Sequence, residues 1–154
     1  LMDGFAYAGE ALSGKYYGAG DKEGLRITVR RLFGFGVIMA LMFTAVYVFG
    51  GVGFLCLLTS DMSVVTAAQP YLFWAYLIPI AGMAAFVLDG VFIGLTATKG
   101  MLFSTAMAMI TFFVVYYLFW NSHGNNALWI AFLSFLGMRG FASILWARRY
   151  LVII

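Results

Sequence analysis

The sequence predicts an all-α integral membrane protein, a polytopic helical bundle with four complete transmembrane helices and the end of a fifth. Hydrophobic residues make up 64% of the 154 residues and charged residues only 10%, and the mean hydropathy is +0.99. Soluble domains are roughly 45–50% apolar and about 25% charged. Uncharged stretches long enough to cross a bilayer also recur along the chain, so lipid is the solvent that suits this composition.

The first two expected helices cover residues 1–20 and 30–50. Leu1 opens directly into the first pattern, which we interpret as the last part of a helix that begins upstream. Residues 32–60 carry no charge, and because a span needs about 20 residues, one helix fits at 30–50. Three glycines should loosen its end into an irregular or interfacial continuation: Gly50, Gly51 and Gly53.

Three further spans are expected at 68–97, 101–120 and 127–149. The middle one is uncharged, and the last is interrupted by Arg139. The segment NSHGNN, residues 121–126, has the composition of a turn between them.

Basic residues flank every second connection, and the other connections hold Asp61 and the neutral 121–126 segment. The positive-inside rule predicts this alternation and assigns the basic connections and the C-terminus to the cytoplasm. Topology and headgroup contact explain these charges, and no basic helix face with base-stacking aromatics suggests nucleic acid. The basic residues are Lys15, Lys22, Arg26, Arg30, Arg31, Lys99, Arg148 and Arg149.

Asp89 is a carboxylate in the middle of an apolar run, FVLDGVFIG at residues 86–94. It lies ten residues before Lys99, which at about 1.5 Å per residue is ~15 Å from the boundary of a ~30 Å core. An ionised carboxylate there costs at least ~2.5–3.5 kcal/mol. A wet cavity, a cationic partner or an added proton would accommodate it, and each suits a site that binds and releases a cation.

Arg139 is the expected partner of Asp89. It lies nine residues before Arg148, so it is ~14 Å from the same boundary by the same helical rise. The two charges therefore lie at similar depth. The alternatives are a static ion pair, or an arginine that extends to the interface and a protonated aspartate without a role.

Asp3 and Glu10 are two further acids in the first expected helix. Asp3 precedes Lys15 by twelve residues, which makes it ~18 Å deep in a regular helix. Glu10 is near enough to Lys15 to reach the interface, so it is either a solvated charge at a helix end or a modulating group. The segments DGFAYAGE and DGVFIGLT share an opening Asp-Gly, which hints at similar sites on two helices but equally fits chance.

Pairs of glycines four residues apart indicate close helix packing. Gly14 and Gly18 form one such pair, and Gly90 and Gly94 form another. Small residues at this spacing let helix backbones touch. Matches are common in a chain with 18 glycines, so they support a helical bundle without identifying it.

Residues that other functions need are missing from the sequence. The single cysteine, Cys56, excludes an internal disulfide, and the single histidine, His123, leaves no His/Cys cluster for a metal. There is no GxSxG nucleophile motif and no GxxxxGK[ST] phosphate loop. We therefore expect no metal site, no catalytic residues and no enzymatic or ATP-driven function.

Four segments together resemble the C-terminal part of a MATE (multidrug and toxic compound extrusion) transporter, and most closely its DinF-like branch. The resemblance covers essentially the whole chain and is most specific in the GxxxGAxD pattern from Gly14 to Asp21 and in the Asp-Gly at 89–90. The segments are DGFAYAGEALSGKYYGAGD (3–21), LLTSD (57–61), LDGVFIGLTATKGM (88–101) and ALWIAFLSFLGMRG (127–140).

The resemblance implies a twelve-helix fold in two six-helix lobes, of which residues 1–154 would form the end of helix 8 and helices 9–12. It implies exchange of small organic cations for H⁺ or Na⁺ and no other cofactor. Asp89 matches an acid on helix 10 that takes part in cation binding in one branch, and Asp3 matches an acid on helix 8. In the DinF-like branch, proton coupling is usually assigned to an aspartate on helix 1, which this chain lacks.

The expected function is secondary multidrug or organic-cation efflux across the bacterial inner membrane by cation antiport. The expected partners are small cationic substrates, membrane lipid and the missing N-terminal lobe, and no nucleic acid. Candidate cavity aromatics for flat cations are Tyr7, Phe86 and Phe92, although packing in lipid or core is the more common role of such residues. Two alternatives are a lipid-linked oligosaccharide flippase of the same superfamily, which would favour a more cationic cavity, and a non-transporting membrane subunit that only packs against a partner.

Overall fold

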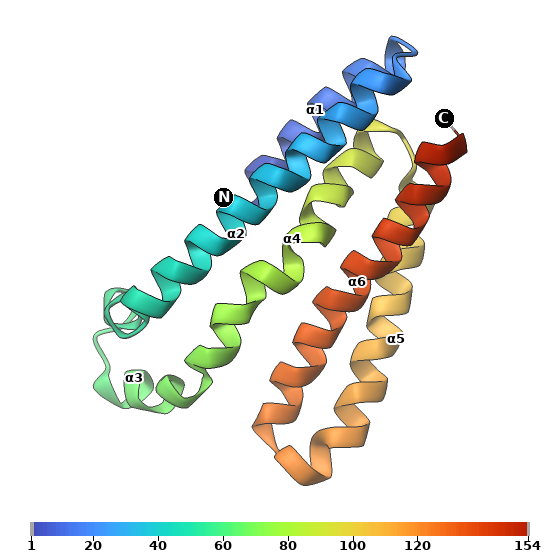
Figure 1. Ribbon diagram of the computed structural model, residues 1–154. Coiled ribbons are helices and arrows are strands. Elements are labelled where there is room, and N and C mark those ends of the chain that lie inside the picture. The colour runs from blue at the N-terminus through green and yellow to red at the C-terminus, as the bar shows by residue number, and fades with distance from the viewer. Residues whose placement is uncertain (1, 154) are drawn as a thin grey trace.

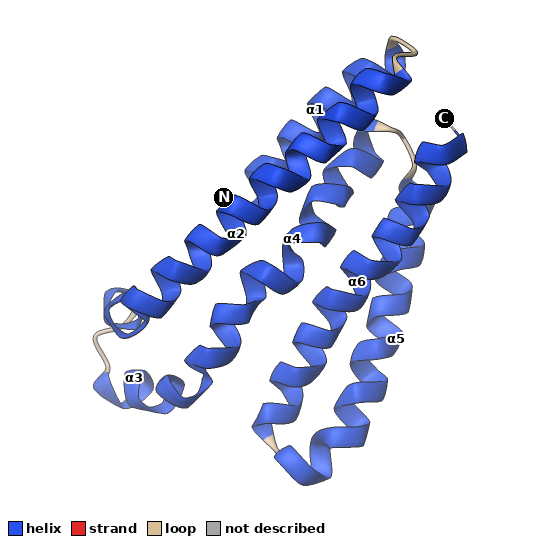
Figure 2. Cartoon of the chain, viewed as in Figure 1, coloured by secondary structure: helices blue, strands red, loops and turns tan. Residues whose placement is uncertain are grey.

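The computed structural model describes the backbone of residues 2–153, and the side chains at 2, 3, 123 and 149–153 lie outside the described part. The described residues form an all-α bundle without strands (Figures 1 and 2). In chain order the elements are α1 (Met2–Gly18), α2 (Lys22–Leu58), α3 (Met62–Ala68), the 3-10 turn η1 (Gln69–Tyr71), α4 (Leu72–Gly94), α5 (Thr98–His123) and α6 (Asn125–Ile153).

Four helical segments of the described chain are long and apolar enough to cross a membrane. With the shorter α1 they make the polytopic all-α membrane bundle that the composition predicts. Large apolar side chains are exposed on its outside, and Phe49 is 91% exposed. Lipid accommodates such side chains, while helices satisfy every backbone polar group internally. The segments are Lys22–Leu58, Met62–Gly94, Thr98–Ser122 and Asn125–Arg148.

α2 corrects the expected helix at 30–50, because it is one helix of 37 residues. It begins where the Asp21 carboxylate accepts a hydrogen bond of 2.8 Å from the backbone N–H of Gly24. The expected irregular continuation was wrong, since the glycines at 50, 51 and 53 are helical. A glycine costs a helix about 1 kcal/mol, whereas each unsatisfied backbone group in hydrocarbon costs several kcal/mol, so the helical hydrogen bonds prevail.

The expected helix at 68–97 is shorter and follows separate elements. α3 begins at the Asp61 cap, η1 contains Pro70, and α4 starts only at Leu72. α4 ends at Gly94, and Thr96 then adopts a positive φ of 55° in the connection to α5. The chain therefore reaches α4 through the short helix α3 and the turn η1.

The turn between α5 and α6 is shorter than the predicted segment 121–126. α5 extends through His123 and α6 begins at Asn125, so only Gly124 lies between them. Gly124 has φ 50° and ψ −125°, which correspond to the first central residue of a type II′ turn and favour glycine. α5 therefore extends beyond both ends of the span expected at 101–120, from Thr98 to His123. α6 likewise extends beyond both ends of the span expected at 127–149, from Asn125 to Ile153.

α4 is the central helix and packs against α1, α2 and α6, while α5 packs mainly against α6. The α1–α2 and α4–α5 connections and the C-terminal end of α6 meet at one end of the bundle, at the top of Figure 1. The α2–α3 and α5–α6 connections lie at the opposite end. The basic residues of the expected cytoplasmic connections thus gather at one end, which we call the basic end.

The closest helix contact joins α1 and α4. A Cβ added at Gly90 would collide with the carbonyl oxygen of Ala6, and one at Gly94 would lie 2.9 Å from the backbone nitrogen of Gly14. On α4 the predicted glycine pair therefore makes this contact. On α1 the contact differs from the prediction, because nothing lies within 4 Å of a Cβ at Gly18.

Candidate functional site

Asp89 of α4 and Arg139 of α6 form an ion pair inside the bundle. Nη2 of Arg139 donates a hydrogen bond to Oδ2 of Asp89 at 2.6 Å. The Asp89 side chain is 13% exposed and that of Arg139 is 21% exposed. The structure thus brings together the two charges that the sequence places at similar depth.

Small residues next to the pair let α4 and α6 approach each other. Gly140 follows Arg139 and is buried, and a Cβ there would lie 3.2 Å from the Cβ of Ala84 and 3.5 Å from the backbone nitrogen of Ala85. The close approach at one turn holds the arginine of α6 within reach of the carboxylate of α4. The ion pair therefore depends on helix packing as well as on charge.

The polar groups of this site are only partly hydrogen-bonded. Oδ1 of Asp89, Nε of Arg139 and the hydroxyl of Ser143 are buried and have no hydrogen-bond partner among the residues that the structure describes. Leaving such a group unpaired costs about 1–3 kcal/mol, so a site of this kind favours an additional polar ligand or a change of state. A carboxylate oxygen can accept further hydrogen bonds or a cation.

Ser143 is a residue that the sequence reasoning missed. It is completely buried and lies one helical turn after Arg139, on the same face of α6. A serine four residues from a charged residue within an apolar span was the available signal. Serine hydroxyls in membrane helices commonly hydrogen-bond to a neighbouring turn or helix, which explains why the spacing alone did not distinguish it.

Glu10 of α1 does not join this pair. Glu10 is half-buried and forms no ion pair with any described residue. Asp3 lies in the first turn of α1, and its side chain lies outside the described part. The structure therefore leaves the expected roles of Glu10 and Asp3 as predictions.

The three aromatic candidates have three different environments. Tyr7 is 71% exposed on α1. Phe86 lines a small apolar pocket of about 10 Å³ where α1, α2 and α4 meet, together with Phe5 and Met83 among others. Phe92 differs from the expectation, because it is 0% exposed and packed in the hydrophobic core. A side chain enclosed in this way offers no face to a substrate in this arrangement of the helices.

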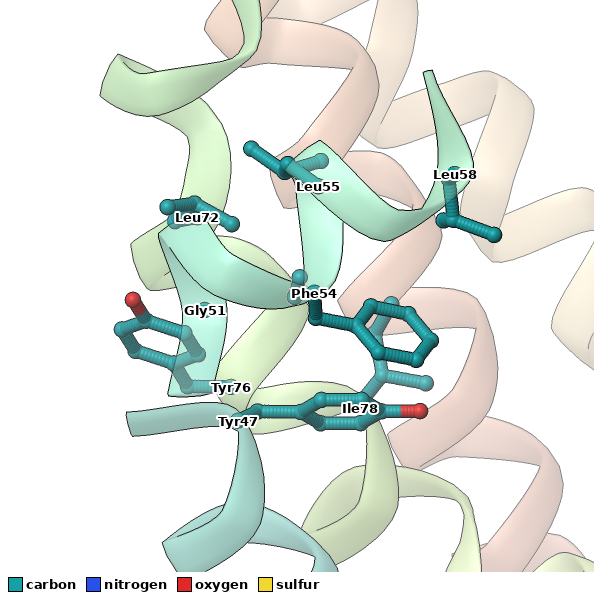
Figure 3. A pocket seen from close by; sticks show the side chains of 9 residues that line it. Tyr47, Gly51, Phe54, Leu55, Leu58, Leu72, Tyr76 and Ile78 are labelled. Atoms are coloured by element: carbon teal, nitrogen blue, oxygen red, sulfur yellow. The ribbon is translucent and has the colours of Figure 1, made fainter. Parts of the chain in front are cut away.

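A larger apolar cavity of about 230 Å³ lies between α2 and the first half of α4. Figure 3 shows the rings of Tyr47 and Phe54 beside each other on its wall, and their centroids are 5.8 Å apart. No charged residue lines this cavity, so it offers no group that could bind a coupling ion. Its lining residues are Tyr47, Gly51, Phe54, Leu55, Leu58, Leu72, Ala75, Tyr76 and Ile78.

Comparison with known proteins gives the family. The model of the MatE family matches residues 1–118. DNA damage-inducible protein F of Escherichia coli (strain K12) is 39% identical over 151 residues, which are 97% of this chain and 32% of that protein. The chain thus spans about a third of the length of this relative, and no solved structure gives a significant match. Because the family model covers most of the chain, the chain belongs to the MatE family.

Proposed function

We propose that this chain is part of a secondary transporter that exports organic cations across the bacterial inner membrane in exchange for H⁺ or Na⁺. Membership of the MatE family supports the transporter class. The observation that supports coupling is the half-buried Asp89–Arg139 pair, in which one carboxylate oxygen is hydrogen-bonded and the other has no partner among the described residues. Charged residues within membrane spans commonly mark ion and substrate pathways.

The proposed mechanism uses competition for the carboxylate of Asp89. In the state described here, the guanidinium of Arg139 neutralises that carboxylate. A proton or Na⁺ bound to Asp89 would replace this attraction, so α4 would be held less tightly to α6. A ligand shifts a conformational equilibrium only by its different affinity for the two states, and loss of the ion pair supplies such a difference. Alternating exposure of the site to each side would then couple ion entry to substrate exit.

Other residues have proposed roles around this pair. Asp3 is a second candidate for cation coupling, and Glu10 is a candidate modulator of the site. Tyr7 and Phe86 are candidates for contact with flat cationic substrates. The basic end would face the cytoplasm, in agreement with the positive-inside rule.

A static role for the pair is the competing proposal, and the short contact between α4 and α6 is the observation that favours it. In a subunit that only packs against a partner, Asp89 and Arg139 would remain paired in every state. Reversing both charges, with Asp89→Arg and Arg139→Asp, distinguishes the two proposals. A purely structural pair predicts that the reversed pair restores every activity, whereas a coupling role predicts restored folding without coupled efflux.

Drug resistance conferred by the full-length protein provides the first test. Asp89→Asn removes the charge with little change in volume, and we expect it to abolish or reshape resistance. Asp61→Asn is the matched control, because Asp61 is exposed in the α2–α3 connection and the amide can still cap α3. Unchanged resistance of the Asp89→Asn variant at normal expression would contradict the coupling assignment.

A further inference from the structure

A groove between α5 and α6 lies on the outside of the bundle. It measures about 360 Å³, at the lower end of the range of roughly 300–1,000 Å³ that is typical of small-molecule sites. All of its lining residues are apolar, and Phe103, Phe141 and Leu145 are exposed as well. The lining consists of Phe103, Met107, Met138, Phe141, Ala142, Leu145 and Trp146.

Two aromatic rings contact each other at one end of this groove. The rings of Phe103 and Trp146 are 5.3 Å apart and join the second turn of α5 to the last turns of α6. This contact lies toward the basic end of the bundle, where α5 begins and α6 finishes (Figure 1). Met107 and Met138 line the groove farther from that end. The two methionines have flexible, polarisable side chains that adapt to irregular apolar ligands.

Two basic residues lie near the end of the groove that holds Phe103 and Trp146. Lys99 precedes Phe103 by four residues, so it lies on the same face of α5 as the groove lining. Arg148 follows Leu145 by three residues on α6. Both side chains are exposed, and neither forms an ion pair with a described residue. The groove is thus apolar along its length and positively charged at one end.

We propose that this groove binds an anionic phospholipid from the leaflet at the basic end of the bundle. An acyl chain would lie between α5 and α6 along Met107 and Met138, and Lys99 and Arg148 would bind the anionic headgroup. Charge complementarity selects this occupant, because an acyl chain alone or an apolar helix of a partner would gain nothing from the two cations. Each basic residue near an anionic membrane surface contributes about a five-fold gain in affinity.

The test uses the purified full-length protein and phosphatidylglycerol that carries a photoactivatable acyl chain. Labelled positions are located by peptide mass spectrometry, with phosphatidylcholine bearing the same chain as the zwitterionic comparison. We expect preferential labelling of the peptides that contain Met107 and Met138 by phosphatidylglycerol. Equal labelling by both lipids, or labelling spread evenly over the other helices, would overturn the proposal.

Two pairs of variants test headgroup and groove separately. Replacing Lys99 and Arg148 with glutamine should weaken labelling about 25-fold, whereas the same change at Lys22 and Arg26, exposed at the same end on α2, should leave it unchanged. These surface substitutions do not alter the core, so unchanged labelling in the first variant would refute the headgroup site.

Filling the groove tests where the acyl chain lies. Met107→Trp places a bulky ring in the lining, while Ala106→Trp adds the same ring at the neighbouring exposed position outside it. We expect only Met107→Trp to displace the label. Equal effects of the two variants would overturn the acyl-chain assignment, and a dimer whose interface covers the groove would identify a second copy as its occupant instead. Neither test depends on the proposed transport activity.

Discussion

Nη2 of Arg139 lies 2.6 Å from Oδ2 of Asp89, so a hydrogen-bonded ion pair connects α6 to α4 within the bundle. Both side chains are only partly exposed, so removal of one partner leaves the other charge partly desolvated and uncompensated, which costs free energy. Removal of both partners costs less. The pair therefore provides a contact whose strength depends on the charge of Asp89, which is the property that ion coupling needs.

A double-mutant cycle measures this dependence. We expect Asp89→Asn and Arg139→Gln each to lower the free energy of unfolding in detergent. The decrease in the double variant should be smaller than the sum of the two single decreases. The expected coupling energy is about 1–3 kcal/mol, as for residues in direct contact. Arg30→Gln is the control, since Arg30 is exposed on α2 and surface changes are usually within about 0.5 kcal/mol. Additive effects of the two central substitutions would show that the pair contributes no net attraction.

The close contact between α1 and α4 leads to a second prediction. Gly90→Ala should destabilise the bundle, because the added Cβ would collide with the carbonyl oxygen of Ala6 in a backbone that cannot move independently. Overpacking of this kind costs about 1–3 kcal/mol. Gly34→Ala is the matched control. Nothing lies within 4 Å of a Cβ at Gly34, so this change should stabilise α2 by about 0.5–1 kcal/mol.

Thermal unfolding of the two alanine variants in the same detergent checks this prediction. The expected order of melting temperature is Gly34→Ala at or above the parent protein and Gly90→Ala below it. An unchanged melting temperature for Gly90→Ala would mean that α1 separates from α4 without cost. In that case the α1–α4 contact would not hold the first helix to the bundle.

The sequence predicted the helices better than their ends. A long apolar stretch predicts a transmembrane helix because crossing a bilayer requires about 20 apolar residues. The four long helices could be predicted from the sequence on this basis. Where a helix ends depends on whether the local backbone continues its helical hydrogen bonds or turns away, and composition does not reveal which of the two occurs. Gly50 remains helical because lipid penalises unsatisfied backbone groups. Gly124 alone makes the turn because it adopts a backbone conformation that residues with a Cβ, such as His123 and Asn125 on either side, disfavour.

The candidate site was predictable where charge was involved and unpredictable where it was not. Asp89 and Arg139 could be matched because each carries a costly charge at a similar distance from a basic boundary. Phe86 and Phe92 could not be distinguished, because lipid is as apolar as the interior and α4 has no polar face that marks its orientation. The packing of the helices shows that Phe92 belongs to the core, in one cluster with Leu25 of α2 and Ala147 of α6.

The connection between α2 and α3 gives a prediction about pH. The Asp61 carboxylate accepts hydrogen bonds from the hydroxyl of Ser63 at 2.7 Å and from its backbone N–H at 2.9 Å. These bonds, the hydroxyl first, hold the pKa of Asp61 below its ordinary value. Since the folded state has the lower pKa, the cap stabilises α3 fully above the ordinary pKa, and this contribution is lost as the pH falls through the lowered one.

Carbon NMR titration of the Asp61 carboxyl group measures this shift. Ser63→Ala removes the hydroxyl donor, so the midpoint should rise toward the ordinary value. Thr66→Ala is the control, because the Thr66 hydroxyl donates to the carbonyl of Met62 and not to the carboxylate. A midpoint that does not move in Ser63→Ala would show that the backbone bond alone caps the helix.

Substrate efflux from proteoliposomes that contain the full-length protein tests the central claim most directly. A Na⁺ gradient and a pH gradient are applied separately to the parent protein and to the Asp89→Asn variant. We predict that at least one gradient drives efflux by the parent protein and that the variant loses this driven component. Normal driven efflux by Asp89→Asn would contradict the account and make the Asp89–Arg139 pair a structural contact between α4 and α6.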